Sequence, residues 1–236
     1  HELDGLALGD VRRDRRAELI LAARWKDPTA RFSGSFPDWG QAKAAYGLIE
    51  QKTSEISMET LLEPHVEATI ARMAVEPLVL LPQDTTSLNY TGLRKTSGLG
   101  VINHEGSRGL FLHSLLAYRP DGIPLGVLDA QAWGRPQTPA ADSRTRNAKS
   151  IDEKESVRWL DALGVAGAAA RRLPRTQLVV MTDREGDLYE LHDAVRISPP
   201  NLHSVIRAQH DRNLEGHQKL WSFMQSQPLG LQRQLK

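Results

Sequence analysis

Residues 78–87 read Leu-Val-Leu-Leu-Pro-Gln-Asp-Thr-Thr-Ser, and residues 178–187 read Leu-Val-Val-Met-Thr-Asp-Arg-Glu-Gly-Asp. In both stretches a short aliphatic run, typical of a strand covered on both faces, is followed closely by an aspartate. We therefore expect Asp84 and Asp183 at the ends of two central strands, where carboxylates are natural ligands for Mg²⁺. Aspartates after strands are also common as helix caps and turn residues, and for an isolated pair that interpretation is favoured.

Composition limits the class of protein. The chain has 236 residues, 40% hydrophobic and 25% charged, which predicts a globular protein with one large and one smaller domain. Its formal net charge is only +1, so the overall charge does not argue for nucleic acid. The absence of cysteine excludes disulfides, thiolate zinc sites and cysteine nucleophiles, and it fits a reducing cytoplasm. We expect no membrane span and no signal peptide, because no apolar run approaches the required length.

The first 75 residues have the apolar spacing of helices. One helix is expected after a cap at Asp10, and a second over residues 39–50 behind a capping box of Asp38 and Gln41. A third is expected over residues 57–73, where Pro64 must lie in the first turns or kink the helix. The sequence therefore predicts a small all-helical domain over residues 1–75.

From residue 77 the pattern changes to strands, expected over residues 78–81, 87–90, 110–118, 123–133, 178–181 and 202–207. Turn residues at 118–122 predict an antiparallel hairpin. Helices are expected over residues 155–172, 185–195 and 220–227, with an exposed polar loop between 133 and 157. This order indicates an α/β domain with a mixed sheet over residues 76–236.

Several stretches, in this order along the chain, together resemble one family. They are residues 8–13 (Leu-Gly-Asp-Val-Arg-Arg), 43–46 (Lys-Ala-Ala-Tyr), 83–90, 109–114, 131–136 (Gln-Ala-Trp-Gly-Arg-Pro), 152–156 with the Trp-Leu pair at 159–160, and 182–185 (Thr-Asp-Arg-Glu). The family is the cut-and-paste transposases of the insertion-sequence-four type, which includes that of transposon Five. The resemblance extends over nearly the whole chain.

The resemblance implies an N-terminal DNA-binding domain and a ribonuclease-H-like core, whose Asp-Asp-Glu triad holds two Mg²⁺ or Mn²⁺ ions. Asp84 and Asp183 match the first two members of the triad, as catalytic residues and metal ligands. It further implies strand cleavage and strand transfer on double-stranded DNA, at the terminal repeats and the target. The enzyme would work as a homodimer bridging two DNA ends, in the bacterial cytoplasm and associated with the nucleoid when bound to DNA.

The chain departs from the family at the third acidic residue. In the family this is a glutamate in a Tyr-x-x-Arg-x-x-x-Glu context, after a β-rich insertion, and no such motif precedes Lys236. Residues 209–236 resemble the entry to that insertion. Three explanations of the missing glutamate stay open: the chain is a fragment, the gene product is truncated, or another chain supplies the glutamate. A truncated, non-catalytic DNA-binding regulator that represses transposition is therefore an alternative, and an unrelated metal-dependent nuclease is a third.

Basic residues are the candidates for DNA contacts. The crowded Arg12, Arg13, Arg15 and Arg16 would contact phosphates without reading sequence, whereas the alternative is a solvated helix face. Lys43 and Tyr46 lie three residues apart on one predicted helix face, where both could contact the DNA end. In the alternative, Tyr46 is a core residue and Lys43 lies at its solvent-exposed rim. Arg184 is expected to pair with a phosphate or a carboxylate.

Three further residues near these motifs have structural explanations. His113 falls within an apolar strand, where a hydrogen-bonded core histidine is the more common case. Trp133 ends a strand, where packing is more common than stacking on DNA. Glu185 follows Asp183 at a predicted helix start, which its negative charge favours through the helix dipole.

Overall fold

The computed structural model describes residues 2–51, 53, 55–93, 95–104, 106–135, 151, 154–228 and 230. Most of the predicted polar loop, residues 136–150, lies outside these ranges, as do Asp152 and Glu153. The helices are α1 (Val11–Lys26), α2 (Trp39–Ile49), α3 (Met58–Met73), α5 (Val157–Arg172), α6 (Tyr189–Arg196) and α7 (Leu220–Ser226), with short 3₁₀ turns η1 (Phe32–Ser35), η3 (Arg184–Gly186) and η4 (Glu215–His217). The strands are β1 (Leu78–Asn89), β2 (Gly100–Val101), β3 (Arg108–Tyr118), β4 (Pro124–Trp133), β5 (Gln177–Thr182) and β6 (Leu202–Ile206).

The N-terminal helices begin where their capping residues predict. Asp10 caps α1, and the Asp38 carboxylate accepts a hydrogen bond from the Gln41 amide at 2.9 Å at the start of α2. The predicted capping box is wrong in one detail, because the Gln41 side chain donates to the Asp38 carboxylate and not back to its amide. The reciprocal box occurs instead in α3, between Ser57 and Thr60.

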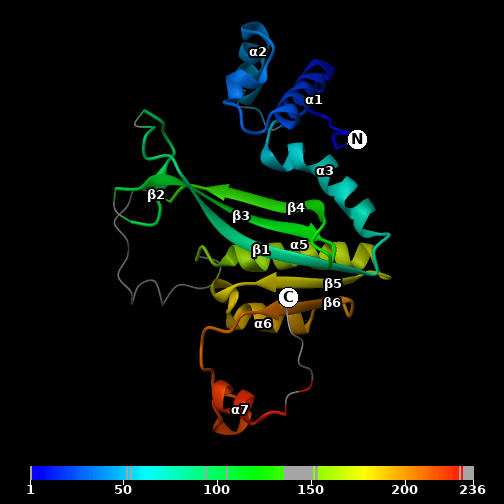
Figure 1. The fold of residues 1–236 in the computed structure, drawn as a ribbon, viewed down its shortest axis with the longest axis vertical. Coiled ribbons are helices and arrows are strands. Elements are labelled where there is room, and N and C mark those ends of the chain that lie inside the picture. The colour runs from blue at the N-terminus through cyan, green and yellow to red at the C-terminus, as the bar shows by residue number, and fades with distance from the viewer. Residues whose placement is uncertain are drawn as a thin grey trace.

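Six strands form one mixed sheet in the order β2-β3-β1-β5-β6, with β4 paired to β3 (Figure 1). β1, β3 and β4 are antiparallel neighbours, whereas β5 and β6 run parallel to β1 and to each other. The mixed sheet and the β3–β4 hairpin are thus confirmed.

Two predicted boundaries are wrong. The strands expected over 78–81 and 87–90 are one strand, β1, so Asp84 lies inside a strand and not at its end. The backbone stays extended through the polar residues because β3 pairs with it from residue 80 to residue 89. The helix expected from residue 185 begins only at Tyr189, because the chain first forms η3 behind its cap, Asp183.

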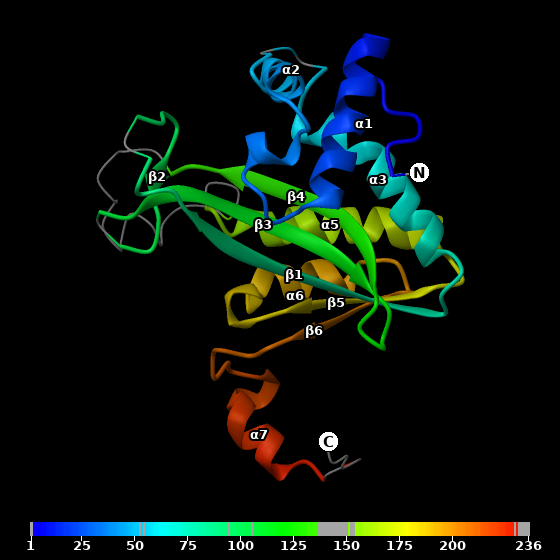
Figure 2. The same ribbon diagram turned by 45° about the horizontal axis from the view of Figure 1, so that its top comes forward.

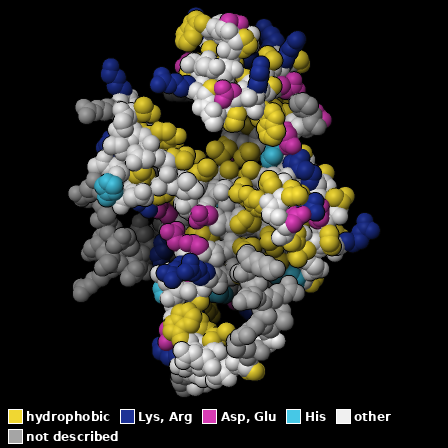
Figure 3. All heavy atoms as spheres, in the orientation of Figure 1, with side chains coloured by type: hydrophobic (Ala, Val, Ile, Leu, Met, Phe, Trp, Pro, Cys, Tyr) yellow, Lys and Arg dark blue, Asp and Glu magenta, His cyan; other side chains and the backbone are white. Residues whose placement is uncertain are grey.

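The main core lies between the sheet and helices α5 and α6, which cover the same face (Figure 2). Side chains alternate along β1, so Val79 and Leu81 are buried against this core. The opposite face carries half-exposed aliphatic residues such as Leu80 and Leu112, and hydrophobic side chains are visible there in Figure 3. Asp84 belongs by alternation to this more open face.

Helix α3 connects the N-terminal helices with the sheet. Leu61, near its start, packs on the small cluster that includes Leu8 and Leu48 from the first helices, whereas Ile70 and Met73 belong to the main core. Pro64 is buried within this helix, in its second turn. The division of the chain at residue 75 stays a prediction, because α3 contributes to both clusters.

Candidate acidic site and DNA-binding surface

The parallel ladder between β1 and β5 brings the two aspartates of the candidate site to matching positions. Its last pair is Pro82 with Met181, and Asp84 and Asp183 each follow two residues later. Asp84 lies within β1, and Asp183 directly follows the last residue of β5 with its backbone still extended, so alternation continues the same row of side chains at both positions. Pairing with Ser114 on β3 keeps Asp84 in place. Strand pairing thus joins residues that are far apart in sequence.

Each aspartate carboxylate makes one local hydrogen bond. Asp84 Oδ1 accepts from the Thr85 amide at 2.8 Å, and Asp183 Oδ1 accepts from the Glu185 amide at 2.8 Å. Both side chains are exposed, and within the described ranges neither forms an ion pair. Asp183 is therefore a helix cap, which was the alternative to a metal ligand in the sequence analysis. Its second carboxylate oxygen is still available to a ligand.

A third carboxylate, that of Glu185, interacts electrostatically with the two aspartates. Partial burial, and then the negative charges of Asp183 and Asp84, raise the pKa of Glu185 above its ordinary value. Acidic side chains gather on the face seen in Figure 3, near the end of β5. Among the residues that the structure describes, however, no three acidic or histidine side chains are placed to hold one metal ion together. The site therefore offers two matched carboxylates and a nearby third.

The turn after Asp183 folds tightly against the end of β5. A Cβ atom at Gly186 would lie 2.5 Å from Thr182, so only glycine allows this approach. Beyond it, the side chain of Asp187 is only 1% exposed and accepts hydrogen bonds from the Gln209 amide at 2.7 Å and from Arg212 Nη2 at 2.8 Å. Asp187 thereby joins the turn after β5 to the chain that leaves β6.

Burial alone would raise the pKa of Asp187, but the hydrogen bonds of Gln209, Arg212, His192 and His210 hold it below its ordinary value. No role for Asp187 follows from the sequence. Its partners on the segment after β6 lie 22 to 25 residues away in sequence, so no local pattern marks them.

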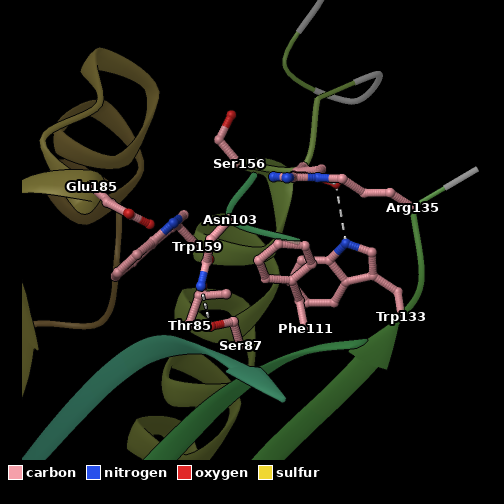
Figure 4. Close-up of a pocket in the computed structure, with 10 residues that line it drawn as sticks. Thr85, Ser87, Asn103, Phe111, Trp133, Arg135, Ser156, Trp159 and Glu185 are labelled. Carbon is pink, nitrogen blue, oxygen red and sulfur yellow. Dashed lines mark hydrogen bonds and ion pairs between the residues drawn. The ribbon is translucent and has the colours of Figure 1, made fainter. Parts of the chain in front are cut away.

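A cleft of about 450 Å³ lies beside the acidic site (Figure 4). Its lining includes Glu185, and Phe111 and Trp133 stack with their ring centroids 5.5 Å apart. The Trp133 indole donates to Glu155, and Arg135 Nη2 lies 2.6 Å from the same carboxylate. The ion pair with Arg135 lowers the pKa of Glu155. Trp133 is therefore packed within the protein, as predicted.

His113 pairs with Thr85, the neighbour of Asp84, and its side chain lies on the face covered by α5. It is fully buried, with Nε2 3.1 Å from Gln83 Oε1 and Nδ1 2.8 Å from the Thr85 hydroxyl. Its ring meets the Trp159 ring edge-on at 4.8 Å. Burial lowers the pKa of His113. The prediction of a hydrogen-bonded core histidine is confirmed, and its two partners flank Asp84.

Replacing His113 by leucine should lower the free energy of unfolding by about 2–4 kcal/mol, because Gln83 and the Thr85 hydroxyl would lose a buried partner. Urea unfolding at neutral pH measures this. The matched control is His203→Leu, since His203 is exposed and its side chain bonds, among the described residues, to Gln177 alone. Equal losses from the two variants would contradict the role of the buried network.

Two of the four clustered arginines are held by the protein itself. Arg12 Nη2 pairs with Asp10 at 2.8 Å, and Arg13 Nη1 donates to the Leu8 carbonyl oxygen at 3.0 Å. Arg15 and Arg16 make no hydrogen bond or ion pair within the described part of the chain. A cleft of about 470 Å³ separates α1 from α2, and its lining residues are Asp10, Arg12, Arg13, Arg16, Ala44, Gly47, Leu48 and Gln51.

Residues 1–53 match the transposase DNA-binding family. This transposase DNA-binding segment contains α1, α2 and the cleft between them. The match supports a transposase with DNA as a partner. A comparison with curated proteins finds no match. In the described part of the chain, no helix is long and apolar enough to cross a membrane.

The transposase DNA-binding segment also contains Lys43 and Tyr46 on α2. Lys43 is exposed. Tyr46 is 37% exposed, and its ring meets Phe32 edge-on at 5.0 Å, so it packs on one side and faces solvent on the other. Outside this segment, Arg184 is exposed beside Asp183, and within the described ranges it forms no ion pair. A DNA contact by any of the three residues stays a prediction.

Proposed function

We propose that this chain is a cut-and-paste DNA transposase of the insertion-sequence-four type, whose mixed sheet is a ribonuclease-H-like core. Asp84 and Asp183 would hold the divalent cations for strand cleavage and strand transfer. The observation that carries the catalytic part is the matched position of these two carboxylates beyond the β1–β5 ladder. The transposase DNA-binding match supports double-stranded DNA as the substrate.

The donor set fits Mg²⁺ or Mn²⁺. Mg²⁺ prefers oxygen ligands and is commonly bound by one or two carboxylates, with waters and substrate phosphates completing the shell. Asp84 and Asp183 are exposed and each has an available oxygen. When bound, two cations would lower the pKa of the attacking water or 3′-hydroxyl and stabilise the leaving oxygen.

The chain's own residues would hold and position the acidic site. Pairing with Ser114 of β3 fixes the backbone at Asp84, and the η3 turn fixes Asp183. Arg184, which is exposed and adjacent to the second aspartate, would contact a phosphate of the bound strand. The homodimer that bridges two DNA ends, and action on the nucleoid in the cytoplasm, belong to this proposal through the family resemblance alone.

A non-catalytic DNA-binding regulator is the second candidate function. The observation that favours it is that, among the described residues, no three acidic or histidine side chains surround one metal position. It also fits the family match, which covers only residues 1–53. The two functions differ in one measurable respect, because a regulator binds the terminal repeat but does not cut it.

Replacing both Arg15 and Arg16 by glutamine should weaken DNA binding to a similar degree on every sequence. Each phosphate contact that is lost should reduce the slope of log affinity against log salt by about 1, so the double variant should lose about 2. Fluorescence anisotropy on two duplexes, one with the element's terminal repeat and one of scrambled sequence, measures this over a salt series.

The control for charge is the double variant Arg171→Gln and Arg175→Gln, which removes two exposed arginines outside the matched segment. We expect its salt slope to equal that of the unmodified protein. If both double variants lose the same slope, binding depends on total charge, and the arginines of α1 do not form the DNA surface.

A further inference from the structure

Trp39 is an exposed aromatic residue at the start of α2, within the transposase DNA-binding segment. The residue is 69% exposed, and its ring makes no contact with the ring of any described residue. The two small clusters formed by the N-terminal helices do not include it. Packing therefore does not explain a tryptophan at this position.

Helical spacing places Trp39 in line with the two α2 residues already expected at DNA. Residues 39, 43 and 46 are four and three apart, so Trp39, Lys43 and Tyr46 form one row on the helix surface. All three are exposed. Glu50, four residues beyond Tyr46, ends this row with an acidic side chain.

This row lies next to the cleft that the arginines line. Ala44 and Gly47 directly follow Lys43 and Tyr46 on α2, and both line the cleft opposite Arg16 of α1. A Cβ atom at Gly47 would meet nothing within 4 Å, so the helix surface between the arginines and the row is open. One surface therefore runs from the arginines of α1 across small residues to Lys43 and the two aromatic rings.

We propose that Trp39 is a DNA-contacting residue and that this surface binds duplex DNA, with the cations on phosphates and the Trp39 ring against a sugar or an unstacked base. The inference rests on the proposed DNA-binding function and adds an aromatic contact to it. DNA is favoured as the occupant because Trp39 shares its row with Lys43, and Arg16 lines the cleft next to that row, so the cations are complementary to a polyanion. Aromatic rings contribute to DNA binding through stacking, independently of charge.

The test is the DNA affinity of Trp39→Ala and Trp39→Phe, with the same labelled terminal-repeat duplex over a salt series. Trp39→Ala should weaken binding about tenfold without changing the salt slope, and Trp39→Phe should keep most of the affinity. Tryptophan fluorescence quenching on addition of unlabelled duplex should fall in both variants. The thermal midpoint should stay unchanged, because the side chain is exposed.

Trp25→Ala is the matched control. Trp25 is even more exposed and lies in the same segment, but nine residues separate it from Arg16, which places it on the opposite face of α1. We expect its DNA affinity to be unchanged. An equal loss from Trp25→Ala, or no loss from Trp39→Ala, would overturn the inference.

Two outcomes separate this inference from the function on which it rests. If the unmodified protein binds neither duplex, the proposed DNA-binding function itself fails. If it binds DNA, but Trp39→Ala changes only the sedimentation of the DNA-free protein, the row is a protein contact and the inference alone is wrong.

Discussion

Replacing either Asp84 or Asp183 by asparagine should lower metal-dependent nicking of a terminal-repeat duplex by about a thousandfold or more, while DNA binding persists. Asparagine retains an oxygen that can accept from the Thr85 or Glu185 amide, so the local backbone should keep its conformation. It removes the negative charge that would hold a divalent cation. Nicking and binding can be scored in one gel, with Mg²⁺ or Mn²⁺ added.

A second readout tests the metal site without relying on cleavage. Addition of MnCl₂ should raise the thermal midpoint of the unmodified protein, because a cation that binds only the folded state stabilises it. The rise should be lost in both aspartate variants. The control Asp193→Asn removes an exposed carboxylate whose ion-pair partner in the described part of the chain is Arg196, and it should keep both the rise and the nicking.

Three results would decide between the candidate functions. Nicking that survives in Asp84→Asn would contradict the assignment of this carboxylate to the catalytic site. A protein that binds the terminal repeat but never nicks it would favour the regulator. Loss of the manganese effect together with loss of nicking would support the transposase.

Replacing Asp187 by alanine should lower the free energy of unfolding at pH 7 by about 3–5 kcal/mol. The substitution removes a buried carboxylate and leaves Arg212 and two backbone amides without their partner. Asp187→Asn should cost less, because its amide oxygen can still accept a hydrogen bond. Urea unfolding measures both, and Asp193→Asn serves as an exposed ion-pair control with a loss below about 1 kcal/mol.

The difference in free energy of unfolding between the unmodified protein and Asp187→Asn should become smaller as the pH falls. The folded protein holds the pKa of Asp187 below its ordinary value of 3.8, so the ionised carboxylate contributes stability at neutral pH. This contribution is lost as the pH falls below that value toward the lower folded pKa. The gap between the unmodified protein and Asp187→Asn should therefore be full at pH 7 and shrink below about pH 4. A gap that stays constant to pH 3 would contradict the charged network.

Local signals in the sequence predicted much of the fold. Capping residues marked the starts of the first two helices, since a side chain bonds to amides only two or three residues away. The turn at 118–122 predicted the hairpin of β3 and β4, and the order of strands and helices predicted the mixed sheet. His113 and Trp133 were correctly assigned to packing, because apolar neighbours along a strand imply burial.

Tertiary structure decided the candidate site, because its residues meet only through pairing between distant strands. The sequence by itself determined that Asp84 and Asp183 each follow an aliphatic run, and it named the arginines near the first helix. Only the parallel pairing of β1 with β5 placed the two carboxylates at matching positions, and only the pairing with β3 kept Asp84 within a strand. The partners of Asp187 likewise depend on contacts between segments that no local pattern encodes.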